Sequence, residues 1–472
     1  MEHIVREEQN IGSDQMKYKT LKINNPEDLI FGDAPLPVMT RRGLNIGGGQ
    51  VYPEVNFTLP PMEVSPKTLP EVRRHYKEIA EGVLERAIQL NSQGLILELE
   101  TVIEMTQYPE IGIELVKTMN EICEDYYQKY KLPTEIRLTP NDLREFDRPP
   151  KQRTSLYLEP MLELFDKGAK EGGNLLSIES TGGKEISDSA LMMCDMKKFI
   201  FSQSVLGVRD MRFLWSKINA IARANNVIAG GDTACGFGNT AMVLADKDYI
   251  PKTFAAIARI ATVVRTLVAI EEGATGPDKD CGYEGPFLKA ITGTPISMEG
   301  KTAACAHLSP IGNVAAAAAD LWSNESVQNI KLLSGMAPVA YYEQLEYDVR
   351  LMNEAKKSGK QDSLVLQKLF VNSDIRFDPQ ALILSPQNVI RISKEIVKGK
   401  NYIEASVLGC LEGLKLINEA LGTGFLKVDE KEIIWIDMLQ NDISEIPFDE
   451  SKFVEMMLPQ LEGAIIPSEY GL

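Results

Sequence analysis

Short apolar or β-branched runs recur along this chain, and helical patterns fill most of the gaps between them. Adjacent runs start roughly 25 to 40 residues apart, which is the length of a β-strand plus a returning helix in a βαβ unit. The eight runs cover residues 94–99, 135–139, 175–179, 199–202, 227–230, 266–270, 291–298 and 327–333. Eight strands with intervening helices predict an α/β fold, a closed TIM-type (β/α)8 barrel, with an open doubly wound sheet as the competing arrangement.

The flanking regions have different patterns. Residues 1–66 lack clear periodicity and are rich in Gly and Pro, so we expect an extended N-terminal segment laid over the main body. The barrel catalytic domain is then predicted for residues 67–335. Helical patterns dominate residues 336–472, where we expect a helical C-terminal extension packed on the barrel, with a loop at 356–363.

Charge and composition narrow the classes of partner. The net charge of -17 and the pI near 4.9 argue against nucleic acid and anionic membranes, because both would repel this chain. The apolar run Phe254–Ile270 contains Arg259 and Arg265, which make it a poor membrane span. The first 20 residues are polar and lack the apolar stretch of a secretory signal. We therefore expect a cytoplasmic protein that binds neither nucleic acid nor membrane.

Cysteine and histidine usage limits the possible metal chemistry. Six cysteines in 472 residues are too few for a disulfide scaffold, and no two form a Cys-x-x-Cys pair. The three histidines are His3, His75 and His307, so a His-rich metal site cannot be assembled. Any transition-metal site must rely on thiolates and carboxylates.

Three potential ligands follow predicted strands, and catalysis in such a barrel takes place where strands end. Glu179 closes one run, while Cys235 and Cys281 follow two later ones. Two thiolates and a carboxylate can form a catalytic zinc site with the fourth position left open. The alternative is that each cysteine is a small buried core residue, which is the default for any one cysteine alone.

Other residues are weaker candidates. Cys123, Cys194 and Cys410 fall in helical patterns and are predicted to be core, while Cys305 and His307 lie after a strand and stay secondary candidates. Asp232, Asp280 and Glu299 lie near strand ends, where each could donate a proton, support a ligand or simply be solvated. The segment 293–302 is similar to a phosphate-binding loop, but Pro295 replaces its first glycine, which discourages nucleotide binding.

The segments that carry these residues resemble the zinc-containing subunit of methanol:corrinoid methyltransferases, the methanol–corrinoid protein co-methyltransferase family. The resemblance rests on residues 175–185, 231–235, 276–284 and 289–302, with Cys305 and His307 after them. Weaker similarity runs from Gly47 and residues 53–56, through residues 322–326 and 378–380, to Tyr470-Gly471. Thr181 and Ala234 depart from the family pattern.

The resemblance implies a β/α barrel that holds one Zn²⁺ through Glu179, Cys235 and Cys281. It further implies transfer of the methyl group of methanol to the Co(I) centre of a corrinoid-binding partner protein, with zinc activating the alcohol oxygen. Asp232 would be a proton donor or a residue that supports a ligand. A complex built on a homo-oligomeric core is compatible with this interpretation. Two alternatives stay open: an O-demethylase acting on another methyl donor, and a non-catalytic acidic binding scaffold.

Overall fold

The structure is a computed structural model of the 472-residue chain. It describes residues 15–59, 61–233, 235–280, 282–301, 311–327, 331–333 and 335–472.

Eight parallel strands form one barrel. In space they follow the order β7-β6-β5-β4-β3-β10-β9-β8, and every hydrogen-bonded neighbour runs parallel. β7 and β8 meet through a bridge between Thr233 and Lys279, which closes the ring. The strands are β3 (Tyr52–Thr58), β4 (Leu95–Glu100), β5 (Thr134–Thr139), β6 (Gly173–Ile178), β7 (Ile228–Asp232), β8 (Asp278–Asp280), β9 (Ile296–Glu299) and β10 (Leu321–Val327). The predicted TIM-type barrel is confirmed.

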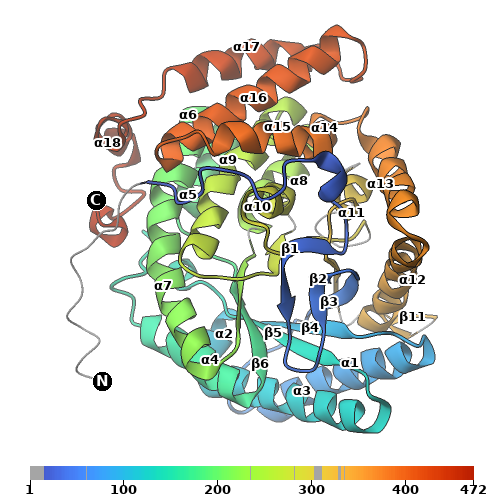
Figure 1. Ribbon diagram of the computed structural model, residues 1–472. Helices are drawn as coiled ribbons and strands as arrows, with labels where there is room; N and C mark the ends of the chain where they lie inside the picture. The colour runs from blue at the N-terminus through green and yellow to red at the C-terminus, as the bar shows by residue number, and fades with distance from the viewer. Residues whose placement is uncertain are drawn as a thin grey trace.

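A helix follows each barrel strand and packs outside it, as Figure 1 shows. These helices are α1 (Leu69–Gln89), α3 (Pro109–Tyr130), α4 (Leu158–Glu171), α7 (Val208–Asn225), α9 (Lys252–Glu271), α10 (Gly285–Thr292), α11 (Gly312–Ala316) and α12 (Ala337–Ser358). Short helices lie in the loops after strands: α2 (Ile103–Gln107), η2 (Leu143–Glu145), α5 (Lys184–Met193), α6 (Met196–Phe201), η3 (Ser202–Gly207), η4 (Cys235–Asn239) and α8 (Thr240–Asp246). A small ribbon of β11 (Lys331–Leu332) and β12 (Gly335–Met336) precedes α12.

Further helices cover one side of the barrel beyond α12. They are α13 (Lys360–Asp374), α14 (Pro379–Leu384), α15 (Pro386–Ile396), α16 (Tyr402–Gly422), α17 (Glu430–Ser444), α18 (Glu450–Met457), η5 (Leu458–Leu461) and η6 (Pro467–Tyr470). In Figure 1 these helices lie on the α9 side of the barrel, where α14, α16 and α17 pack on α9, and α15 packs on α10 and α16. The predicted loop at 356–363 is confined to Gly359, since α12 ends at Ser358 and α13 begins at Lys360.

The predicted limits of the barrel need correction. β3 lies inside the supposed N-terminal segment 1–66, yet it pairs with β4 on one side and β10 on the other. α12 lies beyond residue 335, yet it packs on β3, β10 and α1 as the eighth helix of the ring. The barrel therefore runs from residue 52 to residue 358. The sequence pattern does not indicate β3, because the residues around it are rich in Gly and Pro and the strand itself contains Pro53 and Glu54.

Three of the eight predicted strands are wrong, and a fourth, 291–298, begins in α10 and overlaps β9 only at residues 296–298. Residues 199–202 belong to the helices α6 and η3, and residues 266–270 form the last part of α9. Every residue from Thr253 to Glu271 is buried, so α9 is surrounded by protein on all sides and is apolar all round. A helix of that kind lacks the polar stripe that distinguishes it from a buried strand. The predicted run 327–333 shares only Val327 with β10. The missing strands were therefore β3, the three-residue β8 and nearly all of β10.

Among the described residues, α9 is also the one helix long and apolar enough to cross a membrane by length and composition alone. It is completely buried in the protein, between α7, α14 and α16. Arg259 and Arg265 point into this interior, where Arg259 donates a hydrogen bond to Gln380 (2.7 Å) and Arg265 pairs with Asp232.

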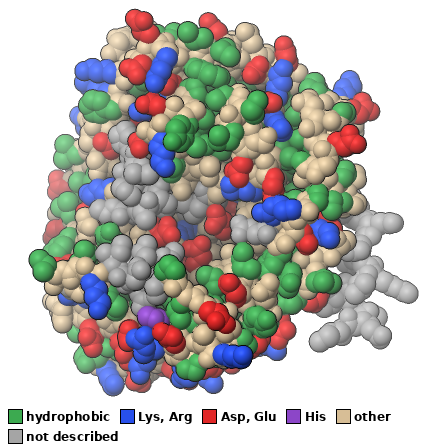
Figure 2. Space-filling view, turned by 180° about the vertical axis from the view of Figure 1, so that it is seen from behind, with side chains coloured by type: hydrophobic (Ala, Val, Ile, Leu, Met, Phe, Trp, Pro, Cys, Tyr) green, Lys and Arg blue, Asp and Glu red, His purple; other side chains and the backbone are tan. Residues whose placement is uncertain are grey.

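An N-terminal hairpin closes the amino-terminal end of the barrel. β1 (Asp33–Met39) and β2 (Asn45–Gly48) pair antiparallel and lie across the front of the barrel in Figure 1; η1 (Pro26–Asp28) precedes them. Leu44 and Ile46 of this hairpin pack against a layer of buried side chains that comes from the first residues of the barrel strands, namely Tyr52, Ile96, Leu175 and Leu321. The carboxyl ends of the strands form the other end, which is seen in Figure 2.

Candidate functional site

Neighbouring strands β6, β7 and β8 bring the predicted ligand positions to one end of the barrel. Glu179 follows β6 directly, and in the register of β6 and β7 Ile178 pairs with Asp232, the last residue of β7. The bridge between Thr233 and Lys279 aligns β8 with β7 at the same level. Positions 179, 235 and 281 therefore follow three adjacent strand ends, as expected for a barrel active site.

The Glu179 carboxylate lies against the backbone that follows Cys235. Cys235 opens the π-helical turn η4, and a Cβ atom at the next residue, Gly236, would lie only 3.1 Å from Oε1 of Glu179. The same Cβ would lie 2.9 Å from Cε of Lys184. Glycine at 236 thus leaves the room that the carboxylate occupies. π-Helical turns are rare and are frequently found at functional sites.

The other end of η4 approaches the chain that follows Cys281. A Cβ atom at Gly238 would lie 3.1 Å from the carbonyl oxygen of Gly282 and 3.3 Å from its Cα. The backbone of η4 therefore passes between Glu179 and the residue after Cys281. Cys281 itself and the side chain of Cys235 lie outside the described residues.

The described side chains alone do not form a metal site. Within that part of the chain, no group of three or more His, Cys, Asp or Glu residues could hold a metal ion. Two of the three predicted ligands lie outside it, so the predicted zinc set stays a prediction. The secondary candidates Cys305 and His307 also lie outside the described residues.

Asp232 is fully buried and contacts Ser180, the residue that follows Glu179. Its Oδ2 accepts a hydrogen bond from Nη1 of Arg265 (2.7 Å), and its Oδ1 accepts one from the backbone N–H of Ser180 (3.2 Å). Arg265 also donates to the carbonyl oxygen and the hydroxyl of Ser180. The Asp232–Arg265 pair thus holds the residue that follows Glu179. Of the two predicted roles for Asp232, this geometry favours support of a ligand over proton donation.

A buried group of charges fills the barrel beneath the strand ends. Nζ of Lys279 lies 2.5 Å from Oε2 of Glu98 and 3.5 Å from Oε1 of Glu299. Burial raises the pKa of Glu299 to about 8, although Lys279 opposes the shift. Burial also raises the pKa of Glu98. For Lys279, burial alone would lower the pKa, but the nearby carboxylates, that of Glu98 first, outweigh burial and raise the pKa.

A second ion pair lies deeper in the barrel. Arg137 of β5 pairs with Glu54 of β3 (2.5 Å), and Nη1 of Arg137 donates to the hydroxyl of Ser177 (2.8 Å). Ser297 completes the group by donating to Glu54 (2.5 Å). Only Glu299 of these interior charges was a candidate from sequence. The alternation in Leu95–Glu100, with Glu98 and Glu100 on one face, is the signal that could have indicated a polar interior.

Of the other described cysteines, two lie in the core as predicted, whereas Cys194, also predicted to be core, is only partly buried. Cys123 in α3 and Cys410 in α16 are fully buried, as predicted, and burial raises the pKa of both thiols to about 12. Such thiols are poor metal ligands, because a ligand must be a thiolate. Cys194 is half-buried at the end of α5, and burial raises its pKa as well.

Comparison with known proteins agrees with this architecture. The family model described as "Methanol-cobalamin methyltransferase B subunit" matches residues 15–471. The chain belongs to this family. It is 35% identical over 462 residues to a protein of Methanosarcina barkeri named methanol–corrinoid protein co-methyltransferase, covering 96% of this chain and 99% of the relative. The family resemblance proposed from sequence is therefore confirmed.

A solved structure of the family has the same fold. The crystal structure of the methanol:cobalamin methyltransferase complex MtaBC from Methanosarcina barkeri matches with a TM-score of 0.92 at 34% identity. The match covers 96% of this chain and 99% of that chain, so the barrel, the N-terminal hairpin and the additional C-terminal helices fall within it. The family is one of methyltransferases, as predicted.

Proposed function

We propose that this chain transfers the methyl group of methanol to the Co(I) centre of a corrinoid carried by a separate protein. Family membership supports the reaction, and the Methanosarcina barkeri relative is named for it. The related crystal structure is of the complex MtaBC, which supports a protein partner. We further propose that one zinc ion, held by Glu179, Cys235 and Cys281, activates the alcohol.

One observation carries the zinc part of the proposal. The Glu179 carboxylate lies against the residue after Cys235, and the same short turn lies against the residue after Cys281. Two thiolates and a carboxylate form a donor set that zinc takes in catalytic sites, with a fourth position left for substrate. Gly236 supports the fit, because a side chain there would displace Glu179. When bound, zinc supplies a Lewis acid at the alcohol oxygen.

The chain's own residues would hold this site and manage the proton. Asp232 and Arg265 keep Ser180, and with it Glu179, at the end of β6. Asp280 pairs with Met298, so Glu299 directly follows the last paired residues of β8 and β9. With a pKa of about 8, Glu299 holds a proton at neutral pH. We therefore propose Glu299, rather than Asp232, as the acid that shares its proton with the departing oxygen.

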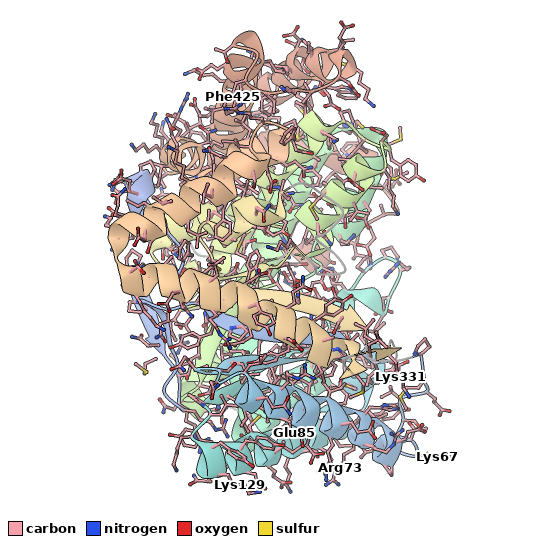
Figure 3. All side chains as sticks on the ribbon, turned by 90° about the vertical axis from the view of Figure 1, so that its right-hand side faces the viewer. Lys67, Arg73, Glu85, Lys129, Lys331 and Phe425 are labelled. Atoms are coloured by element: carbon pink, nitrogen blue, oxygen red, sulfur yellow. The ribbon has the colours of Figure 1, made fainter. Side chains whose placement is uncertain are left out.

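The shape of the molecule supports approach of the corrinoid from one side. The N-terminal hairpin blocks the amino-terminal end of the barrel. At the opposite end, acidic side chains gather around a central hollow (Figure 2). The side view in Figure 3 places Lys67, just before α1, and Lys331, just after β10, at this same edge, with Lys129 toward the other. A partner would present its flat corrinoid ring here.

Metal analysis and a donor panel test the proposal. Purified protein should contain about one zinc per chain, because a structural or catalytic ion of this type is tightly held. With free cob(I)alamin, methanol should give methylcobalamin, followed by its absorbance, whereas methoxylated compounds should not. Turnover of a methoxylated compound without turnover of methanol would assign an O-demethylase instead. Protein with neither metal nor turnover would indicate a binding scaffold.

Replacing the proposed ligands one at a time distinguishes cysteines that bind zinc from cysteines that only pack in the core. Cys235→Ala and Cys281→Ala should each lose the zinc and reduce methyl transfer to background, since a catalytic zinc with two protein ligands is held weakly. The matched controls are Cys123→Ala and Cys410→Ala, which remove buried thiols in α3 and α16 and should keep both. Full zinc content and activity in either ligand variant would refute the assignment.

A further inference from the structure

The segment 467–472 packs against the loop that carries Glu179. We call residues 179–183 the ligand loop; it joins β6 to α5. Tyr470 of η6 is fully buried, and its hydroxyl accepts a hydrogen bond from the backbone N–H of Gly183 (3.2 Å), the last residue of the ligand loop. Gly183 has a φ of +78°, so its backbone is in the left-handed region that favours glycine.

Arg144 connects Tyr470 to the neighbouring glycine. Its guanidinium carbon lies 4.0 Å from the centroid of the Tyr470 ring, and its Nη2 donates to the carbonyl oxygen of Glu469 (3.1 Å). Nε of Arg144 donates to Asp210, at the start of α7. A Cβ atom at Gly182 would lie 2.5 Å from Oδ2 of Asp210, so that carboxylate rests directly on the ligand loop.

Glu469 anchors the segment from the other side. Its Oε2 accepts hydrogen bonds from the backbone N–H groups of Gln152 (2.8 Å) and Arg153 (2.7 Å), and the Thr154 hydroxyl donates to its Oε1. Burial alone would raise the pKa of Glu469, but these hydrogen bonds outweigh burial and lower the pKa. The side chain is 2% exposed and remains charged at neutral pH. Segment 467–472 is therefore fixed to the loop between β5 and α4.

The barrel and its loops hold the ligand loop at Ser180, Thr181 and Gly182, whereas the C-terminal segment holds it at Gly183. Asp142, Asp232 and Arg265 hold Ser180 and Thr181, and all three lie within the barrel and its loops. Gly182 and Gly183 rest on Asp210 and Tyr470. Two consecutive glycines have no side chains of their own to pack, so these external contacts decide where the backbone lies.

We infer that Tyr470 is a positioning residue for the proposed metal ligand Glu179, acting through the amide of Gly183. The inference rests on the proposed function, because it assigns Tyr470 a role at the zinc site proposed there. Groups that orient metal ligands usually change metal affinity by about 10- to 100-fold when they are lost. Tyr470 lies 287 positions after Gly183 in the sequence, so this contact joins the C-terminal segment to the ligand loop.

Tyr470→Phe is the direct test, because it removes one hydroxyl and keeps the ring on Arg144. Zinc affinity, measured by competition with a chromogenic chelator, should fall by about 10-fold. The visible spectrum of the Co²⁺-substituted protein, which reports the geometry of the ligands, should shift relative to the unmodified protein. The matched control is Tyr52→Phe, which removes a hydroxyl that donates to Gln50 (3.1 Å) at the opposite end of the barrel. It should leave the affinity and the spectrum unchanged.

The outcomes separate this inference from the proposed function. If the unmodified protein binds zinc and Tyr470→Phe matches it in affinity and Co²⁺ spectrum, the positioning role is overturned. If the unmodified protein binds no zinc, the proposed function fails first. Should Tyr470→Phe not fold, Glu469→Gln carries the test, since it keeps an oxygen acceptor but removes the charge. Weaker zinc retention in that variant supports the role, and unchanged retention overturns it.

Discussion

Glu299 lies buried beside Lys279 and Glu98, where burial raises its pKa from 4.5 to about 8. In the unfolded chain the carboxyl would have its ordinary pKa, so between these two values the folded protein binds a proton that the unfolded chain has lost. Its contribution to stability is fully present below about pH 4.5 and is lost as the pH rises through about 8.

Glu299→Gln should therefore change the dependence of stability on pH. Glutamine cannot ionise, so the free energy of unfolding of the variant, relative to the unmodified protein, should rise by about 1.4 kcal/mol per pH unit between about pH 5 and 8. Above that range the difference should level off. Urea unfolding at a series of pH values measures it, and a difference that stays flat across the range would contradict the raised pKa.

The Asp232–Arg265 pair has a different role that mutation can also test. Asp232→Ala leaves the Arg265 guanidinium buried without its carboxylate, and the expected loss is about 3–5 kcal/mol in the free energy of unfolding. Replacing both residues, as in Asp232→Ala with Arg265→Met, should cost less than the single change. A fully stable Asp232→Ala protein that keeps zinc but transfers no methyl group would instead make Asp232 a participant in the reaction.

At the scale of elements, α9 is the helix against which the C-terminal helices are assembled. Gly409 and Gly413 of α16 face it, and a Cβ atom at Gly413 would lie 2.3 Å from Cδ1 of Ile260. The two glycines let α16 approach α9 closely. This contact, together with α14 and α7, buries α9, the one helix in the described part of the chain that is long and apolar enough to cross a membrane.

Gly413→Val should disrupt this contact. Overpacking of a tight interior site costs about 1–3 kcal/mol, which urea unfolding followed by circular dichroism would record. Gly422, the last residue of α16, has nothing within 4 Å of a Cβ position. Gly422→Ala should be neutral or stabilise by up to about 1 kcal/mol, because alanine favours helix. Equal stability for both variants would mean that α16 does not pack closely on α9.

The same elements explain what sequence patterns could predict. β4, β5 and β6 are continuous buried strands that apolar runs indicate, and Glu179 could be placed because it ends one of them. α9 was partly misassigned because a helix buried all round has no polar face. β8 has three residues, all of them charged, so no apolar run indicates this strand in the sequence. The contacts of Tyr470 and Lys279 could not be predicted, since their partners lie far away in the sequence.

At the scale of the whole molecule, the barrel depends on residues at both of its ends. β3 pairs along its full length with β10, from Tyr52 with Leu321 to Thr58 with Val327, and it also pairs with β4. α12 packs on both β3 and β10 from outside. The first strand of the barrel, β3, and the last helix of its ring, α12, therefore both belong to the closed barrel.

A fragment of residues 67–335 should therefore fail to fold. It lacks β3 and α12, so β4 and β10 would become exposed edges on an open sheet. We expect no cooperative thermal transition by circular dichroism for the fragment, whereas the full chain should unfold in a sharp one. A fragment with a sharp transition and a helix content in proportion to its length would show that those residues form a self-sufficient domain.

The N-terminal hairpin that seals one end of the barrel also constrains the order of events in the proposed reaction. Because the hairpin covers the amino-terminal end, we expect both methanol and the carrier to approach from the carboxyl ends of the strands, the side that a docked carrier would cover. Methanol is then expected to enter before the carrier arrives, and the water formed from the leaving oxygen to depart after it. Steady-state kinetics with the intact carrier should accordingly follow a compulsory sequence, with the alcohol first.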